Sequence, residues 1–283
     1  MKILIIGASG FIGLRVYEHL KKYSCYEIVG TYFKNKKNES FIHLDISNKR
    51  QVEKILIEFK PEVVFWLAGS KNLKECEASL EFAQQSNTYP VQNCLEILKK
   101  NNLNTNFIFF STDYVFNGIK GNFTDSDIPN PKTNYGLSNY LAEKSIISSG
   151  VKYTIIRTSA VMGEGGIFFN WLIKNLKKND MIELFADIFF TPTPIELLNE
   201  NVLNIIEQNI FGIFHICGNQ RLSRYEFAIV MKNFKSIFKA TLIPSSGHEN
   251  MNIFQTDLSL FPSKICIQKQ TLEDYLREEI KND

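Results

Sequence analysis

Short apolar runs alternate with amphipathic segments through the first 160 residues of the chain. Unbroken aliphatic runs predict buried strands, whereas apolar residues spaced three or four apart predict helices. The predicted strands are Lys2–Ile6, Glu27–Tyr32, Phe41–Leu44, Glu62–Leu67, Phe107–Ser111 and Tyr153–Thr158, and the predicted helices are Phe11–Lys22, Asn48–Phe59, Leu80–Asn101 and Tyr135–Ser148. Because strands that alternate with helices form parallel βαβ units, we expect an α/β fold with a doubly wound parallel sheet and helices on both faces.

Beyond about residue 160 the alternation becomes irregular. The pattern predicts helices near 166–178, 195–208 and 223–237, and strands near 181–186 and 211–216. No flexible linker separates the two halves, so we predict a core of residues 1–160 and a smaller C-terminal α/β lobe of residues 161–283, with some segments packing back on the core. This lobe should fold onto the carboxyl edge of the sheet, where open α/β sheets bind their ligands.

A glycine-rich turn, Gly7-Ala8-Ser9-Gly10-Phe11-Ile12-Gly13, joins the first predicted strand to the first predicted helix. The first glycine allows the tight turn, the second lets the backbone approach a pyrophosphate, and the third lets the helix pack closely on the strand. The phosphate would sit on free N–H groups at the helix N-terminus. In this context the turn predicts a Rossmann-type site for a nicotinamide dinucleotide, with an ordinary βα turn as the alternative.

The end of the second predicted strand carries lysines where NAD would require a carboxylate about 20 residues beyond the glycines. The strand runs into Phe33-Lys34-Asn35-Lys36-Lys37, which favours the 2′-phosphate of NADP and leaves NAD as the second choice. A solvated basic loop without a ligand is the alternative interpretation. Asp45 and Ile46 follow the third strand, where Asp45 either accepts from the adenine amino group or caps the next helix.

Composition and charge argue against several other classes of protein. The 283-residue chain has a net charge of +2, which provides no strong field for nucleic acid or an anionic membrane. No apolar run reaches the length of a membrane span, and no signal peptide fits before the strand that starts at Lys2. Five cysteines and four histidines are scattered without metal-ligand spacing, so we expect reduced thiols, no metal site and a cytoplasmic protein.

Further motifs follow the glycine turn at regular places along the chain. They are Leu67-Ala68-Gly69, Asn87, Ser111-Thr112-Asp113-Tyr114-Val115-Phe116, Asp127-Ile128-Pro129, Tyr135-Gly136, Ala142-Glu143, Arg157-Thr158-Ser159, Thr191-Pro192-Thr193 and Phe214-His215. Together they resemble the dTDP-4-dehydrorhamnose reductases, which are short-chain dehydrogenases of the extended type, and also the related regulatory beta subunits of methionine adenosyltransferase.

The resemblance implies NAD(P)H-dependent hydride transfer to a 4-keto group of a nucleotide-activated deoxysugar, in the synthesis of surface polysaccharide sugars. Thr112 would orient the carbonyl and Tyr135 would donate the proton. The cofactor site would comprise Gly7, Ser9, Gly10, Phe11, Ile12, Gly13, Lys34, Asp45, Ile46, Leu67, Ala68, Gly69, Asn87 and Ser111. The expected partner is a nucleotide-sugar substrate, and the resemblance leaves room for a homodimer.

One position breaks the family pattern at the centre of the chemistry. The family places a lysine four residues after the tyrosine, where this chain has Asn139. An asparagine still hydrogen-bonds a ribose, but it supplies no charge to stabilise a phenolate. Tyr140 and Lys144 have the same four-residue spacing, yet Tyr140 lies five residues past Tyr135 and so turns about 140° away on a helix.

The substrate lobe also departs from the family. Ala160 replaces an aromatic residue, and Ile188-Phe189-Phe190 follows Asp187 where the family has a polar residue. Two functions are therefore the main alternatives: a reductase of a nucleotide-activated keto-sugar, or a catalytically weak or silent subunit that binds a dinucleotide and regulates a partner. A dehydratase, an epimerase or other sugar-nucleotide chemistry on the same scaffold also stays open. Retention of Thr112 and Tyr135 favours the reductase, whereas Asn139 favours the silent subunit.

Overall fold

The computed structural model describes residues 1–178, 180–247 and 255–280, which form two compact units. The first unit comprises Met1–Val115, Pro131–Arg157 and Val202–Phe214. The second comprises Phe116–Asn130, Thr158–Asn201 and His215–Asp283, as far as these residues are described. The chain therefore passes between the units more than once.

A seven-stranded sheet forms the centre of the first unit, in the order β11-β6-β5-β4-β1-β2-β3. The strands are β1 (Lys2–Ile6), β2 (Glu27–Tyr32), β3 (Ile42–His43), β4 (Val63–Trp66), β5 (Asn106–Thr112), β6 (Lys152–Thr158) and β11 (Gly212–His215). Strand β1 pairs in parallel with both β2 and β4, and β4 pairs in parallel with β5. The order reverses at β1, as the doubly wound fold requires, which confirms the predicted fold class.

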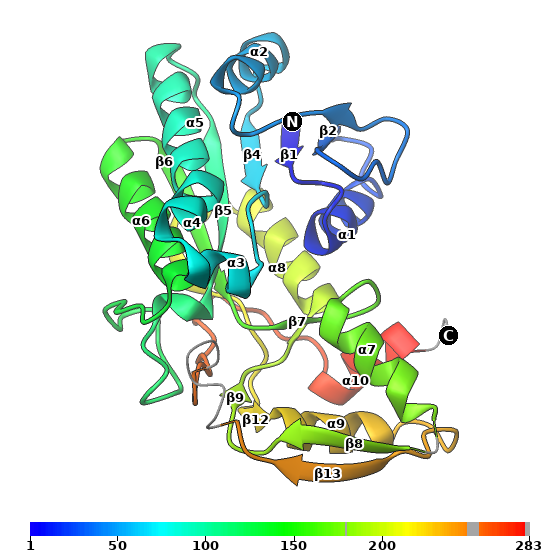
Figure 1. Ribbon diagram of the computed structural model, residues 1–283. Helices are drawn as coiled ribbons and strands as arrows, with labels where there is room; N and C mark the ends of the chain where they lie inside the picture. The colour runs from blue at the N-terminus through cyan, green and yellow to red at the C-terminus, as the bar shows by residue number, and fades with distance from the viewer. Residues whose placement is uncertain (179, 248–254, 281–283) are drawn as a thin grey trace. The chain divides into compact units, whose positions relative to one another are not determined.

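Helices cover both faces of this sheet (Figure 1). Helix α1 (Phe11–Leu20) lies on one face, and α2 (Lys49–Phe59), α4 (Leu80–Asn87), α5 (Tyr89–Lys100) and α6 (Asn134–Ser149) lie on the other. The apolar faces of α2, α5 and α6 share one core with the strands, in which Leu56, Leu98, Ile146 and Trp66 are buried. Burial of both sheet faces explains why strands such as β4 are apolar at every position.

The predicted long helix Leu80–Asn101 is wrong, because the chain forms two helices with Thr88 between them. Pro90 lies in the first turn of α5. A proline has no N–H and tolerates only the first turn of a helix, so α4 cannot continue through it. The first unit also contains a short helix that was not predicted, α3 (Leu73–Ala78), and a 3₁₀ turn, η1 (Asp113–Val115), directly after β5.

The second unit is built from helices and short paired strands. Its elements are β7 (Val161–Met162), α7 (Ile167–Leu176), β8 (Met181–Phe185), β9 (Phe189–Phe190), β10 (Thr193–Pro194), the start of α8 (Ile195–Glu207), β12 (Leu222–Ser223), α9 (Arg224–Lys232), β13 (Thr241–Ser245) and α10 (Leu272–Ile280). Strands β8 and β13 pair in parallel, as do β7 and β10, whereas β9 and β12 pair antiparallel. Phe169, Leu172, Phe227 and Leu276 bring α7, α9 and α10 into one core.

Several differences from the predicted pattern lie in this unit, in which the short strands β7, β9, β10 and β12 were not predicted. The predicted helix 223–237 begins after the N-cap Ser223 and ends earlier, at Lys232, with Asn233 as its C-cap. Asparagine is a poor residue for a helix interior because its side chain competes for backbone hydrogen bonds. Strand β13 and helix α10 were not predicted. Among the residues that the structure describes, no helix has the length and apolarity needed to cross a membrane.

Candidate active site

Packing fixes two of the three glycines in the turn between β1 and α1. Gly7 has a φ of +91°, and a Cβ there would lie 2.7 Å from the backbone nitrogen of Ala68. At Gly13 a Cβ would lie 2.3 Å from the carbonyl oxygen of Gly7. Gly10 is different, because its Cβ would meet only that same oxygen, at 3.3 Å. A side chain at Gly10 would therefore fill space outside the protein backbone, where a ligand has to approach.

The N-terminus of α1 is suited to an anion. Gly10 is its N-cap, with an extended backbone and no side chain that caps the helix. The first N–H groups of a helix have no partner within it, and they carry the positive end of the helix dipole. Ser9, Phe11 and Ile12 are only partly buried around this end. The turn therefore has the geometry and charge that suit an anionic group, and the binding of a pyrophosphate there stays a prediction.

The region after β2 presents exposed cations. Lys34 and Lys37 are exposed, and the Lys34 ammonium lies 5.8 Å from the ring centroid of Phe33. Lys36 forms an ion pair with Glu39 at 2.9 Å, which neutralises part of the cluster. Lys34 is thus the member of the cluster nearest the end of β2 and is outside that ion pair.

The structure shows that Asp45 is not the N-cap of helix α2. Asn48 caps α2 by accepting from the backbone N–H groups of Arg50 and Gln51, so Asp45 is not the cap. The Asp45 Oδ1 instead accepts from the N–H of Ser47 at 2.9 Å and from its hydroxyl at 2.7 Å. Asp45 and Ile46 are partly buried where the chain leaves β3.

Asn87 organises the loop that follows β4. Its Oδ1 accepts from the N–H of Ser70 at 2.8 Å, and its Nδ2 donates to the carbonyl of Ser70 and to the hydroxyl of Ser138, both at 3.1 Å. The side chain is buried and clamps the backbone beyond Leu67, Ala68 and Gly69 to α6. Asn87 therefore shapes the predicted cofactor edge through the loop that it holds.

Tyr135 and Thr112 come together in the first unit. Thr112 ends β5, Tyr135 lies in the first turn of α6, and the Thr112 side chain is close enough to the phenol to affect its pKa. The Thr112 hydroxyl also donates to the Asp113 carboxylate at 3.0 Å and accepts from the N–H of Tyr114 at 3.2 Å. The ring of Tyr114 packs edge-on against that of Tyr135, with centroids 5.6 Å apart.

The surroundings of Tyr135 keep its phenol protonated. Burial raises the pKa of Tyr135 to about 12, the nearby Thr112 hydroxyl opposes this rise, and Asp113 and Cys76 add to it. At neutral pH this phenol is a proton donor.

Asn139 bonds to the helix that carries it. Its Nδ2 donates to the carbonyl of Tyr135, one turn earlier, at 2.9 Å, and the side chain is buried. Lys144 lies over the ring of Tyr140, 5.8 Å from the centroid, and is exposed to solvent. Tyr140 and Lys144 thus pair with each other and not with Thr112.

Glu77 holds the start of helix α6, a role that the sequence did not indicate. Its carboxylate accepts from the N–H of Tyr135 at 3.2 Å, and its carbonyl accepts from the side chain of Asn134 at 3.2 Å. The hydroxyl of Thr133 caps the same helix through the N–H of Gly136. The N-terminus of α6 is thereby satisfied by protein groups, unlike that of α1, which leaves α1 as the better place for an anion.

A buried ion pair lies behind the two catalytic candidates. Arg157 donates to both carboxylate oxygens of Glu143, at 3.0 and 2.7 Å, and the hydroxyl of Ser111 donates to one of them at 2.5 Å. Glu143 and Arg157 stand in motifs that carry the family resemblance, but the sequence assigned them no role. Only the folded structure shows that they meet.

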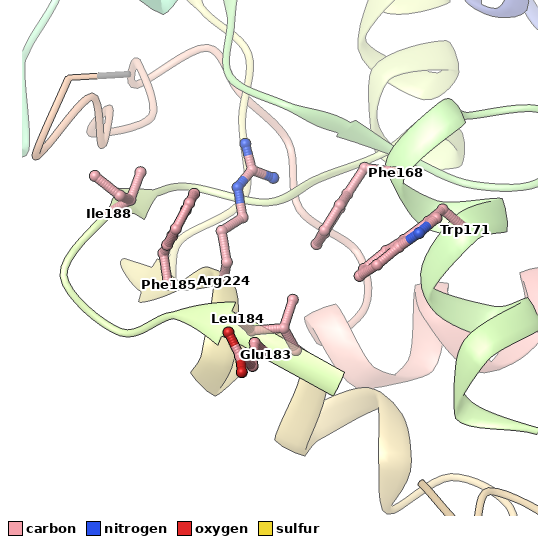
Figure 2. Close-up of a pocket in the computed structure, with 7 residues that line it drawn as sticks. All are labelled: Phe168, Trp171, Glu183, Leu184, Phe185, Ile188 and Arg224. Atoms are coloured by element: carbon pink, nitrogen blue, oxygen red, sulfur yellow. The ribbon is translucent and has the colours of Figure 1, made fainter. Parts of the chain in front are cut away.

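The second unit holds a cavity of about 360 Å³ (Figure 2). It is lined by Phe168, Trp171, Glu183, Leu184, Phe185, Ile188 and Arg224. The guanidinium carbon of Arg224 lies 4.0 Å from the ring centroid of Phe190 and 4.6 Å from that of Phe168. Most of the wall is apolar or aromatic, with Arg224 as a cation held against aromatic faces, and Ile188 makes one side apolar where the family has a polar residue. No cluster of potential metal ligands occurs among the residues described.

Comparison with known proteins agrees with this geometry. The family model described as RmlD substrate binding domain matches residues 1–253. The dTDP-4-dehydrorhamnose reductase of Aggregatibacter actinomycetemcomitans is 30% identical over 238 residues, which cover 81% of this chain and 78% of that protein. Methionine adenosyltransferase 2 subunit beta of Xenopus tropicalis is 23% identical over 261 residues, covering 86% of this chain and 75% of that protein.

A solved structure shows the same fold over the full length. The dTDP-4-dehydrorhamnose reductase of Bacillus anthracis, determined in complex with NADP, has a TM-score of 0.88 and 24% identity, and the match covers 100% of this chain and 99% of that one. The predicted resemblance is thereby confirmed: the chain belongs to the RmlD substrate binding domain family.

Proposed function

We propose that the chain is an NADPH-dependent reductase of a nucleotide-activated 4-keto-deoxysugar, acting in the cytoplasm in the synthesis of polysaccharide sugars. The observation that carries the proposal is that Thr112 lies close to Tyr135 in the same unit as the glycine turn. The reductase of A. actinomycetemcomitans supports the reaction class, and the NADP complex of the B. anthracis reductase supports the cofactor. That the chain forms a homodimer stays a prediction.

In the first unit, some residues would bind the cofactor and others would orient the substrate and transfer the proton. The start of α1 holds the pyrophosphate, and Lys34 approaches the 2′-phosphate. When bound, the cofactor supplies the hydride. Thr112 orients the keto oxygen, and Tyr135 gives its phenolic proton to the alkoxide that forms at C4. Because the phenol is fully protonated at neutral pH, the acid is present before each turnover.

The cavity of the second unit supports a substrate that combines a flat base with an anionic group. Its aromatic wall offers stacking surface for a base, and Arg224 offers planar N–H donors for a phosphate. A cavity of about 360 Å³ falls within the usual range for ligand pockets.

A second function follows from one observation, the replacement of the family lysine by Asn139. Without an ammonium beside Tyr135, the phenolate that forms during proton transfer has less stabilisation. Each pKa unit corresponds to about 1.4 kcal/mol, so a loss of two or three units costs roughly ten- to a thousandfold in rate. The relative named methionine adenosyltransferase 2 subunit beta is a subunit by its name, which supports a role of this chain as a partner subunit.

Gly10→Val tests the cofactor turn. The valine side chain would occupy the open space above Gly10, so we expect loss of NADPH binding in a protein that keeps its circular dichroism spectrum. Gly13→Ala is the matched contrast, because its Cβ meets the Gly7 carbonyl and should lower the melting temperature. Normal NADPH affinity in folded Gly10→Val, measured by fluorescence titration, would place the cofactor elsewhere.

Lys34→Ala tests the choice of cofactor. We expect wild type to bind NADPH more tightly than NADH, and the variant to lose roughly tenfold or more in NADPH affinity with little change for NADH. Lys36→Ala is the control, since Lys36 is already paired with Glu39 and should contribute less. Equal affinities of wild type for the two cofactors contradict the proposed 2′-phosphate site.

Tyr135→Phe tests the proton donor. The variant keeps the ring and loses the acid, so we expect NADPH binding to persist while turnover of 4-keto nucleotide sugars falls by orders of magnitude. Because the pKa of Tyr135 is raised to about 12, the phenol stays protonated as pH rises, and wild-type turnover should not decline through loss of this proton between pH 7 and 10. Turnover by Tyr135→Phe at the wild-type rate refutes the assignment.

Asn139→Lys separates the two functions. In a reductase with an impaired site, the ammonium would stabilise the phenolate and raise turnover by roughly tenfold or more. NADPH oxidation is measured with dTDP-, UDP- and GDP-linked 4-keto sugars. If neither wild type nor Asn139→Lys consumes NADPH with any of these substrates, the reductase proposal fails and the silent-subunit function replaces it.

A further inference from the structure

Helix α6 carries three polar residues on one stripe. Tyr135, Asn139 and Glu143 follow one another at a spacing of four residues, so they project from neighbouring turns of the same side. The first is the proposed acid and the third is the buried carboxylate. Glu143 therefore lies on α6 two helical turns after Tyr135.

Two consecutive residues at the end of β5 meet this stripe. The Ser111 hydroxyl donates to the Glu143 carboxylate at 2.5 Å, and Thr112 accepts from the N–H of Tyr114, whose ring packs against that of Tyr135. Because both contacts join the same strand end to the same helix, the Ser111 bond fixes how far α6 is displaced along β5. That displacement sets the separation of the Thr112 and Tyr135 hydroxyls.

Arg157 makes the Glu143 carboxylate a rigid anchor. The guanidinium binds both carboxylate oxygens from β6, and the two side chains are 3% and 0% exposed. A bidentate pair has one preferred geometry, and a buried carboxylate that is fully hydrogen-bonded has little freedom to turn. Two strands of the sheet, β5 and β6, thus hold a single point of α6.

We propose that Glu143, Ser111 and Arg157 form a positioning triad that aligns Tyr135 with Thr112. The inference rests on the proposed function and extends it to residues behind the reacting groups. It also reassigns Ser111, whose hydroxyl points to Glu143, from cofactor binding to support of the acid.

Ser111→Ala is the main test, because it removes one bond and leaves the ion pair intact. A displacement of the acid by about 1 Å costs on the order of 10- to 100-fold in rate. We expect kcat to fall by that amount, with the dissociation constant of NADPH within twofold of wild type. Weaker NADPH binding with unchanged kcat at saturating cofactor would instead make Ser111 a cofactor ligand and overturn the proposal.

Glu143→Gln extends the test to the anchor, and Glu96→Gln is its control. Glu96 forms an exposed ion pair with Lys49 at 2.6 Å on α5, so the control removes the same charge far from α6's stripe. We expect kcat to fall in folded Glu143→Gln and to stay unchanged in Glu96→Gln. If Glu143→Gln does not fold, Ser111→Ala decides alone; if both variants fold and keep the wild-type kcat, the triad is only structural.

A measurement without turnover keeps this inference separate from the proposed function. Tyrosine labelled with ¹³C at Cζ gives a signal for Tyr135 that is assigned by its loss in Tyr135→Phe. Thr112→Val shows how this signal moves when the Thr112 hydroxyl is absent. We expect Ser111→Ala to shift it in the same direction, even if wild type reduces no sugar. An unmoved signal in Ser111→Ala contradicts the positioning role.

Discussion

Parallel pairing around β1 is the constraint on which the rest of the first unit depends. The register places Ile6 of β1 beside Trp66 of β4, and Trp66 beside Phe109 of β5. Parallel strands end at the same edge, so the turn at Gly7, the loop after Leu67 and the end of β5 at Thr112 all leave the sheet on one side. The glycines follow from this crowding: the Gly7 position touches the backbone of Ala68, and Gly13 touches Gly7 itself.

The two helices that start at this edge have different N-termini, and the difference assigns their tasks. Helix α1 begins at a glycine with no side-chain cap, so its dipole and N–H groups face outward. Helix α6 begins under the hydroxyl of Thr133 and the carboxylate of Glu77, so its N–H groups are used within the protein. The start of α1 is therefore available to an anion, whereas protein groups occupy the start of α6 and hold Tyr135 in place.

Local signals in the sequence predicted the parallel sheet and the glycine turn, because both depend on spacing within short segments. The roles of Thr112 and Tyr135 came from the family resemblance. Pro90 was a local signal for the break between α4 and α5 that the apolar periodicity concealed. Other features depend on residues that lie 32 or more positions apart in the sequence. They are the paired short strands of the second unit and the contacts of Glu77 with Tyr135 and of Ser111 with Glu143. No periodicity records such a contact. Asn139 was predicted as a change of charge, and the structure adds that its amide is bonded to the Tyr135 carbonyl.

The charges around Tyr135 bear on how readily the site transfers a proton. Its neighbours Asp113, Cys76 and Glu77 carry or can acquire negative charge, and Asn139 contributes none. With a pKa of about 12, only about one phenol in 10⁵ is ionised at pH 7. Reduction of a ketone takes its proton from this phenol, and oxidation of an alcohol returns a proton to the phenolate. Both directions start from the protonated resting phenol and pass through the same transition state, so a lysine that stabilises the phenolate would speed both. Its replacement by asparagine therefore slows reduction and oxidation alike and does not by itself favour a reductase over an epimerase.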